Sequence, residues 1–251
     1  MLDTVRHERT LVLTLNLPKK KNAISRAMCE AILRELDVAG ADEGVRAVVI
    51  TGANGTFCAG GDFDDMQERG IGGWREHFDH VVRLARRMIS YPKPIIAAVE
   101  GWAVGAGVSL ACCCDLIVAA DDARFAYGFD KVGVLPDMGL IYTLPLRVGV
   151  VRARQIMIWG ERFDAPQAKA DGLVDRLAAP GKALEAALEA ATTVAASAPL
   201  PIGYLKSFTT EGLDRALAFE KDCASVLFTS ADHSEGVAAF KARRQPVFVG
   251  R

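Results

Sequence analysis

Residues 94–107 read PIIAAVEGWAVGAG, an apolar run that passes directly into a glycine-rich loop. The segment Ile95–Val99 is apolar and rich in β-branched residues, which favours a buried strand. After the loop, residues 106–114 predict a short helix. Residues 46–62, RAVVITGANGTFCAGGD, have the same design of a β-branched run followed by small residues. Strand and helix alternating in this way predict a layered α/β fold.

The remaining sequence extends this rhythm outward from the two glycine-rich loops. Near the N-terminus two strands are expected, followed by a helix that Ser25 caps. Beyond residue 140 the pattern becomes helical, with only one short strand. The predicted strands cover residues 2–7, 10–15, 46–50, 95–99, 116–119 and 175–177. The predicted helices cover residues 26–40, 74–90, 106–114, 150–159, 165–170, 182–197 and 213–240.

Composition narrows the possible partners and compartments. A chain of 251 residues, 51% of them hydrophobic, is long enough to bury one large core. Thirty basic and thirty-one acidic residues leave a net charge of −1, which predicts no nucleic-acid partner and no membrane partner. The strongly apolar run 94–99 is too short to span a bilayer, and the charged N-terminal residues are unlike a signal peptide. A cytoplasmic location is therefore expected.

Neither cysteine nor histidine predicts a metal site. Cys112, Cys113 and Cys114 are consecutive and no CxxC pair is present, so the six cysteines are interpreted as small buried apolar residues. His77 and His80 are spaced as on one face of a helix, but no third ligand is recognisable nearby. Four large apolar residues are expected to fill the core, with an acyl tunnel as the alternative: Trp74, Phe78, Met88 and Trp102.

The two glycine-rich loops carry the strongest chemical signal. Each is expected to end a strand and to begin a helix at once, so that the first N–H groups of the helix are free to bind an anion. Asp62 is then expected near the positive end of the first helix. The alternative is that both loops are tight turns with no ligand.

Several motifs, taken in order, resemble the crotonase superfamily, also called the enoyl-CoA hydratase/isomerase family. The resemblance is carried by residues 51–62, 92–107, 114–115, 18–23, 133–137 and 235–248. It implies an α/β fold in which ββα units form a spiral, with a core domain at 1–195 and a helical trimerisation region at 196–251. It further implies an acyl-CoA thioester substrate, with coenzyme A as part of the substrate and no permanently bound cofactor. Self-association as a homotrimer or a dimer of trimers is also implied.

The resemblance assigns roles to individual residues. The thioester oxygen would accept hydrogen bonds from the backbone N–H groups of Gly61 and Ala106, which stabilise the negative charge that develops there. The lysines at 19–21 and Lys241 are candidates for the coenzyme phosphates, with solvated surface charge as the alternative. The residues assigned to substrate binding are Lys21, Ala23, Ala59, Asp62, Phe63, Ser109, Phe129 and Lys241.

The sequence departs from the family at the two glutamates that a hydratase uses to activate water. Their expected positions hold Ser109 and Phe129. Asp137 is then the strongest acid/base candidate, because one carboxylate is enough to shift a double bond, and burial among apolar neighbours would raise its pKa. The alternative is that Asp137 only caps the following helix. Asp130 is the reserve candidate.

An enoyl-CoA isomerase is therefore the favoured interpretation. Hydratase, acyl-CoA hydrolase and carbon–carbon bond activities of the same superfamily remain open, because each uses the same pair of N–H groups. A non-catalytic acyl-CoA binder would also explain the missing glutamates. A short-chain dehydrogenase is a further alternative, since Tyr127 and Lys131 have the spacing of its catalytic pair, although the glycine loop lies too late in the chain.

Overall fold

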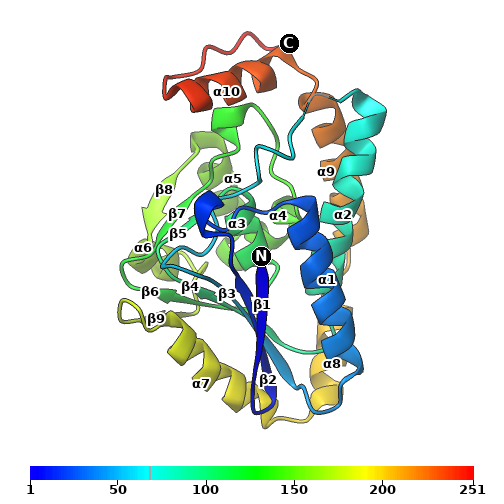
Figure 1. Ribbon diagram of the computed structural model, residues 1–251, viewed down its shortest axis with the longest axis vertical. Helices are drawn as coiled ribbons and strands as arrows, with labels where there is room; N and C mark the ends of the chain where they lie inside the picture. The colour runs from blue at the N-terminus through cyan, green and yellow to red at the C-terminus, as the bar shows by residue number, and fades with distance from the viewer. Residues whose placement is uncertain (68) are drawn as a thin grey trace.

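The computed structural model describes residues 1–67 and 69–251, and its centre is a six-stranded sheet (Figure 1). The strand order is β1-β2-β3-β4-β6-β9. Only the pair β1 and β2 is antiparallel; the other neighbours run parallel. The bounds are β1 (Leu2–His7), β2 (Thr10–Leu15), β3 (Ala47–Gly52), β4 (Ile95–Val99), β6 (Leu116–Ala120) and β9 (Arg176–Ala178). All six predicted strands are therefore confirmed.

Strands β3 and β4 lie at the middle of this sheet and are buried along nearly their whole length. Val48 pairs with Ile95 and Ile50 with Ala97, so two β-branched runs lie side by side. Strands buried on both faces are expected to be continuous apolar runs, as these are. One face is covered by α7 (Ala183–Ala195), which contacts strands from β2 to β9 and buries a stripe of alanines.

On the other side, a layer of helices forms the right-hand side of Figure 1. It consists of α1 (Arg26–Ala41), α2 (Ile71–Ile89) and α9 (Leu213–Leu227), with α2 packed between the other two. The side-chain hydroxyl of Ser25 accepts a hydrogen bond from the N–H of Met28 at 3.2 Å, which confirms the predicted N-cap of α1. Trp74 and Met88 of α2 are buried, as the core interpretation expects. Phe78 is buried too, but it also borders a small cavity.

A second, three-stranded sheet was not predicted. It contains β5 (Trp102–Val104), β7 (Arg124–Ala126) and β8 (Arg162–Asp164), in that order. The chain passes from β4 into β5 through Gly101 at φ +57°, and then into α3 (Ala106–Cys112). A Cβ at Gly101 would lie 2.2 Å from the carbonyl oxygen of Gly55, so only glycine fits there. Strand, strand and helix in succession form the ββα unit of a crotonase-like spiral.

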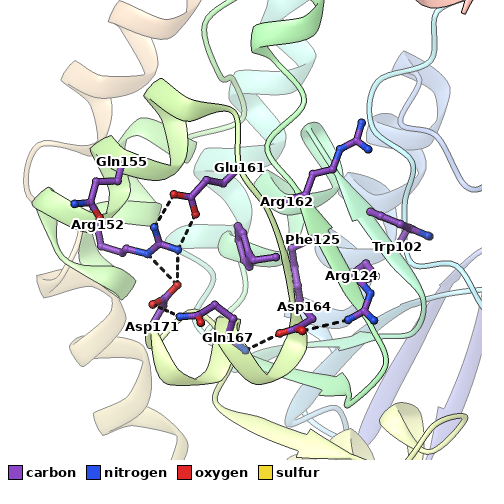
Figure 2. Close-up of a pocket in the computed structure, with 11 residues that line it drawn as sticks. Trp102, Arg124, Phe125, Arg152, Gln155, Glu161, Arg162, Asp164, Gln167 and Asp171 are labelled. Atoms are coloured by element: carbon purple, nitrogen blue, oxygen red, sulfur yellow. Dashed lines mark hydrogen bonds and ion pairs between the residues drawn. The ribbon is translucent and has the colours of Figure 1, made fainter.

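A wide, open hollow of about 730 Å³ lies beside this second sheet (Figure 2). Its polar wall is an ion-pair network in which Arg152 bonds both carboxylate oxygens of Glu161, at 2.9 and 2.8 Å, and also bonds Asp171 at 2.9 Å. Trp102 lies at this hollow with 42% of its surface exposed. The prediction that Trp102 fills the core is therefore wrong, because β5 lies in the smaller sheet and its first residue faces outward.

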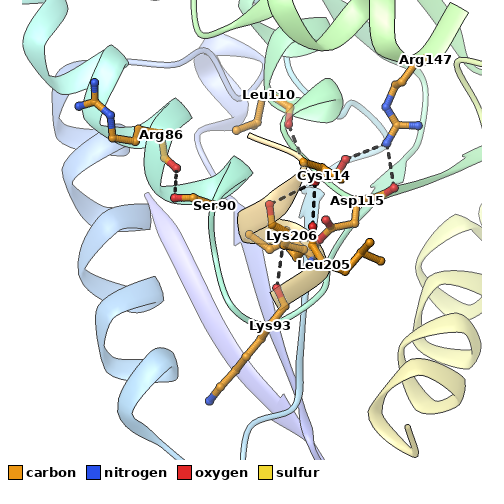
Figure 3. A network of polar contacts seen from close by, with 11 residues as sticks. Arg86, Ser90, Lys93, Leu110, Cys114, Asp115, Arg147, Leu205 and Lys206 are labelled. Carbon is orange, nitrogen blue, oxygen red and sulfur yellow. Dashed lines mark hydrogen bonds and ion pairs between the residues drawn. The ribbon is translucent and has the colours of Figure 1, made fainter. Parts of the chain in front are cut away.

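The first C-terminal helix, α8 (Pro199–Phe208), is tied to the core by a buried lysine (Figure 3). Lys206 is only 6% exposed, and its ammonium group lies 2.5 Å from Asp115 and 3.2 Å from the carbonyl oxygen of Lys93. Arg147 donates to the carbonyl oxygens of Cys114 and Asp115 in the same network. A buried charge is tolerated only when it is paired in this way.

The C-terminal part differs from the prediction in its helix boundaries. The helix expected over 213–240 is two helices, α9 and α10 (Ala231–Ala242), because Ser230 starts a new helix by accepting a hydrogen bond from the N–H of His233 at 3.0 Å. No range was predicted for α4 (Leu140–Val148), although the cap alternative for Asp137 assumes a helix there. Helix α8 and β8, a second strand beyond residue 140, were not predicted. The helices α5 (Val150–Trp159) and α6 (Ala165–Ala170) are as predicted.

Other expectations about the fold have mixed outcomes. Five cysteines are buried, which agrees with their interpretation as small apolar residues, whereas Cys223 is partly exposed. Within residues 1–67 and 69–251, no helix combines the length and apolarity needed to cross a membrane. The domain boundary at residue 195 and the trimer stay predictions.

Candidate active site

The two glycine-rich loops meet because the first one pairs with β5. The N–H of Cys58 donates to the carbonyl oxygen of Trp102 at 3.0 Å, and the N–H of Val104 donates back to Cys58 at 2.9 Å. This parallel bridge places the end of the first loop beside the start of α3. A Cβ added at Gly107 would lie 2.4 Å from the carbonyl oxygen of Cys58, so the approach depends on glycine.

Two backbone N–H groups remain free at this meeting point. Around Gly61, the carbonyl oxygen of Gly60 accepts from Ile24 at 2.8 Å and the N–H of Asp62 donates to Ile24 at 2.8 Å, while the N–H of Gly61 itself has no acceptor among the described residues. Ala106 is the first residue of α3, a position whose N–H has no partner within a helix. Gly61 and Ala106 line one cavity of about 180 Å³.

The first loop differs from the prediction in one respect. No helix begins directly after Gly61: α2 starts at Ile71, and the described residues between them are irregular. Asp62 therefore does not lie at a helix N-terminus. Its carboxylate instead binds the ammonium group of Lys20 at 2.7 Å and accepts from the N–H of Asp64 at 3.1 Å. Lys20 is held by this pair and by Asp64, 2.7 Å away.

The cavity of about 180 Å³ gathers more than half of the residues predicted for the site. Besides the two free N–H groups, its wall includes Asp137, Ala59, Phe63 and Phe129. The ring of Phe63 stacks on Phe240 of α10, with 4.7 Å between the ring centroids. The last helix therefore closes one side of the cavity, although it lies more than 170 residues further along the chain.

Five predicted substrate-binding residues are not in the wall of this cavity, and Asp62, paired with Lys20, is one of them. Lys21 and Lys241 are exposed outside it. Ala23 is buried. The carbonyl oxygen of Lys21 accepts from the N–H of Ala59 at 3.0 Å, which fixes the two segments to each other. Ser109 is completely buried in α3, and its hydroxyl has no hydrogen-bond partner among the described residues.

Among the carboxyl groups that line the cavity, that of Asp137 is the one best placed to act as an acid or a base. Its Oδ1 is buried and has no partner within the described chain, although the residue keeps some surface toward the cavity. Burial raises the pKa of Asp137 to about 7, and only a bond to its own backbone N–H opposes the shift. The helix-cap alternative is wrong: α4 begins after Gly139, and no side chain caps it.

The turn that follows Asp137 is strained and firmly held. Met138 has φ +55° and Gly139 has φ +79°, and a residue with a side chain adopts the first value only at a cost. Glu220 of α9 accepts hydrogen bonds from the N–H groups of Gly139 and Ile141, at 2.7 and 3.0 Å. Burial, with a smaller contribution from Asp137, raises the pKa of Glu220 to about 8. Nothing in the sequence pattern marks Glu220, which lies within a long helical run.

Asp130, the reserve candidate, also lines the cavity. Its Oδ1, like that of Asp137, is buried without a partner among the described residues. Its Oδ2, however, is 2.9 Å from the ammonium group of Lys131, so this carboxylate already has a counter-ion. Asp137 has none among the residues described. The structure thus brings both carboxylates to the cavity and leaves Asp137 as the one without a cation.

The fold and the paired N–H groups define a protein of the crotonase type. The family model for enoyl-CoA hydratase/isomerase matches residues 6–251. The 2,3-dehydroadipyl-CoA hydratase of Escherichia coli (strain K12) is 35% identical over 250 residues, covering 98% of this chain and 97% of the relative. The 1,2-epoxyphenylacetyl-CoA isomerase of the same strain is 34% identical over 249 residues, covering 96% and 95%.

Comparison of structures leads to the same family. The crystal structure of an enoyl-CoA hydratase/isomerase from Pseudoalteromonas atlantica T6c matches with a TM-score of 0.89 and 32% identity, covering 99% of both chains. The chain therefore belongs to the enoyl-CoA hydratase/isomerase family of the crotonase superfamily, and it is an acyl-CoA enzyme of that type. The short-chain dehydrogenase alternative is wrong.

Proposed function

We propose that this enzyme moves the double bond of an enoyl-CoA thioester, with Asp137 as the single proton carrier. The observation that carries the proposal is the position of Asp137 in the cavity that also holds the N–H groups of Gly61 and Ala106. The two positions where a hydratase would have glutamates are Ser109, which is buried outside that cavity, and Phe129, an apolar ring in its wall.

The reaction follows from these groups. The thioester oxygen accepts hydrogen bonds from Gly61 and Ala106, which acidify the hydrogens on C2. The carboxylate of Asp137 removes one proton from C2 of a 3-enoyl thioester, and the electron pair spreads over a dienolate whose charge rests on the oxygen. Asp137 then returns the same proton to C4, which gives the 2-enoyl thioester. A pKa near 7 suits a group that must both accept and release a proton near neutral pH.

The coenzyme is proposed to lie outside the cavity, across the loop at residues 18–23 and α10. Lys21 and Lys241 are exposed there and are the proposed phosphate contacts, whereas Lys20 is committed to Asp62 and Asp64. Ala23 and Ala59 are proposed to contact the coenzyme through their backbone. The stacked rings of Phe63 and Phe240 would then separate the coenzyme from the acyl group.

A turnover screen tests the proposal. The enzyme is incubated separately with 3-hexenoyl-CoA and with 2-hexenoyl-CoA, and the products are separated by chromatography and identified by mass. Conversion of 3-hexenoyl-CoA to 2-hexenoyl-CoA is expected, with hydration much slower. Hydration of 2-hexenoyl-CoA without isomerisation, or binding of both thioesters without turnover, would contradict the proposal.

A further inference from the structure

A second, smaller cavity lies against the first. Its volume is about 40 Å³, and it shares part of its wall with the larger cavity, namely Gly61, Met66, Ala106, Asp137 and Phe228. An acyl chain whose carbonyl group lies at the two free N–H groups and whose reacting carbons lie at Asp137 would therefore have this space beside it. A substituent on the acyl chain could therefore lie in the smaller cavity.

Two histidines of α2, His77 and His80, form part of the smaller cavity's wall. They are 8% and 6% exposed, and their rings meet edge to face with 4.8 Å between the centroids. Neither imidazole has a hydrogen-bond partner within residues 1–67 and 69–251, and Nδ1 of His80 is completely buried. A buried polar atom left unpaired is unfavourable, so Nδ1 of His80 favours a polar ligand in this cavity.

The electrostatics indicate which kind of polar ligand fits. Burial lowers the pKa of both His77 and His80 to about 4, with further lowering by neighbouring cations and, for His77, by His80. The charged groups in the wall of the same cavity are Arg26, Asp62, Asp65 and Asp137. Arg69 and Glu30 also act on the imidazoles from outside it. Neutral imidazoles each offer one donor and one acceptor. They suit an uncharged oxygen better than a carboxylate, because Asp62, Asp65 and Asp137 also line this cavity. The arginine in its wall, Arg26, is already paired with Glu30 at 2.9 Å.

We infer that the preferred thioesters carry an uncharged oxygen, a hydroxyl or a keto group, on the acyl chain beyond the reacting carbons, and that His77 and His80 bind it. This inference depends on the proposed function in one respect only, namely that the acyl chain extends from the two free N–H groups past Asp137. The remaining wall of the cavity is largely apolar, with Met66, Phe78, Val81, Met138 and Phe228. The two imidazoles therefore select for the oxygen, while these side chains enclose the carbon chain.

Water is the competing occupant. A polar cavity of about 40 Å³ is large enough for a bound water. A water that fully satisfies both rings would leave the enzyme without preference for an oxygen-bearing chain. Binding measurements separate the two cases.

The experiment uses saturated thioesters, which bind but have no double bond to shift. Dissociation constants are measured by calorimetry for hexanoyl-CoA, 4-hydroxyhexanoyl-CoA, 5-hydroxyhexanoyl-CoA, 5-oxohexanoyl-CoA and adipoyl-CoA. At least one hydroxy or oxo thioester is expected to bind about tenfold more tightly than hexanoyl-CoA, the effect of one good hydrogen bond. Adipoyl-CoA, which ends in a carboxylate, is expected to bind no more tightly than hexanoyl-CoA.

Three histidine variants connect the preference to the cavity. His80→Leu and His77→Leu are expected to abolish or reverse it, and His7→Leu, on the exposed strand β1, is expected to leave it unchanged. Thermal unfolding confirms that each variant is folded. The inference is overturned if wild-type protein shows no preference for any oxygen-bearing chain, or if both cavity variants keep it. Selective binding by a protein that fails the turnover screen would remove the isomerase and leave this inference standing.

Discussion

Oε2 of Glu220 accepts a hydrogen bond of 2.7 Å from the N–H of Gly139, two residues beyond Asp137. Glu220 comes from α9, so a helix of the C-terminal region fixes the turn that carries the proposed proton carrier. The sulfhydryl of Cys113 holds the other side of the turn by donating to the carbonyl oxygen of Met138 at 3.1 Å. A residue with an unfavourable φ persists only where its surroundings hold it in this way.

Removing the carboxylate of Glu220 should therefore disturb both stability and catalysis. Glu220→Leu leaves the buried N–H groups of Gly139 and Ile141 unpaired, so the free energy of unfolding should fall by about 2 kcal/mol or more. The kcat should fall while KM changes little, because the turn, not the coenzyme contacts, is altered. Denaturant unfolding and steady-state kinetics measure these effects. Glu220→Gln keeps an acceptor and should lose less on both counts; equal losses would argue against the positioning role.

The carboxyl groups of Asp137 and Glu220 should make the protein less stable as pH rises from about 6.5 to about 8. The pKa values of Asp137 and Glu220 are raised to about 7 and about 8 in the folded state, whereas unfolded carboxyls titrate near 4. Between these values the folded chain binds more protons at these two groups than the unfolded chain, so their deprotonation favours unfolding. Below about pH 6.5 the lowered pKa values of His77 and His80 act in the opposite direction, because only the unfolded imidazoles bind protons there. Urea unfolding at several pH values measures the slope. Glu220→Gln should make it shallower, and an unchanged slope would contradict the assignment.

The catalytic rate should depend on pH in the opposite sense to the stability: it should increase as pH rises from acidic values. The carboxylate form of Asp137 is the base, so kcat/KM for a 3-enoyl-CoA should rise with pH through an apparent pKa near 7. A profile already flat at pH 5 would indicate an ordinary carboxyl group or a different base.

The N–H of Ala106 can be removed with little damage to the fold. Proline is tolerated at the first position of a helix, where the N–H has no helical partner. Ala106→Pro should lower kcat about a hundredfold or more, the usual effect of one lost donor to the developing oxyanion. Val150→Pro is the matched control, since Val150 also begins a helix after a glycine and is 64% exposed. Similar losses in both variants would show that the effect is structural.

The hydroxyl of Ser109 should be dispensable. It is buried without a partner and is not in the wall of the larger cavity. Ser109→Ala should leave kcat/KM within about twofold and raise stability by about 1 kcal/mol, because a buried unpaired hydroxyl is unfavourable. Thr143→Val is the contrasting variant. The hydroxyl of Thr143 donates to the carbonyl oxygen of Gly139 at 3.0 Å, so its removal should lower stability. A large loss of activity in Ser109→Ala would restore its predicted role in binding.

The parts of the fold that follow from local chemistry were predictable. Strands β3 and β4 are short apolar runs bounded by glycine or proline, and Ser25 caps α1 with its own side chain. Strands β5, β7 and β8 have only three residues each, too few for a pattern to emerge. The break between α9 and α10 also escaped prediction, because helical spacing continues through Phe228 and only Ser230 marks the new start.

The site was predictable where one segment defines it and not where distant segments meet. The loops at Gly61 and Ala106 were recognisable because small residues follow a buried strand. Their approach depends on the pairing of Cys58 with β5, a contact between segments more than 40 residues apart. Glu220 and the pair His77 and His80 lie on helices whose sequence pattern is the same whether or not a cavity adjoins them.

The most direct test of the account is the isomerisation of 3-hexenoyl-CoA by the variant Asp137→Asn, compared with Asp130→Asn. The product is identified by mass spectrometry after chromatography. Asp137→Asn should lower kcat at least about a hundredfold and keep its affinity for hexanoyl-CoA, while Asp130→Asn should stay within a few-fold of wild type. Wild-type rates in Asp137→Asn, with the loss falling on Asp130→Asn, would contradict the assignment of Asp137 as the proton carrier.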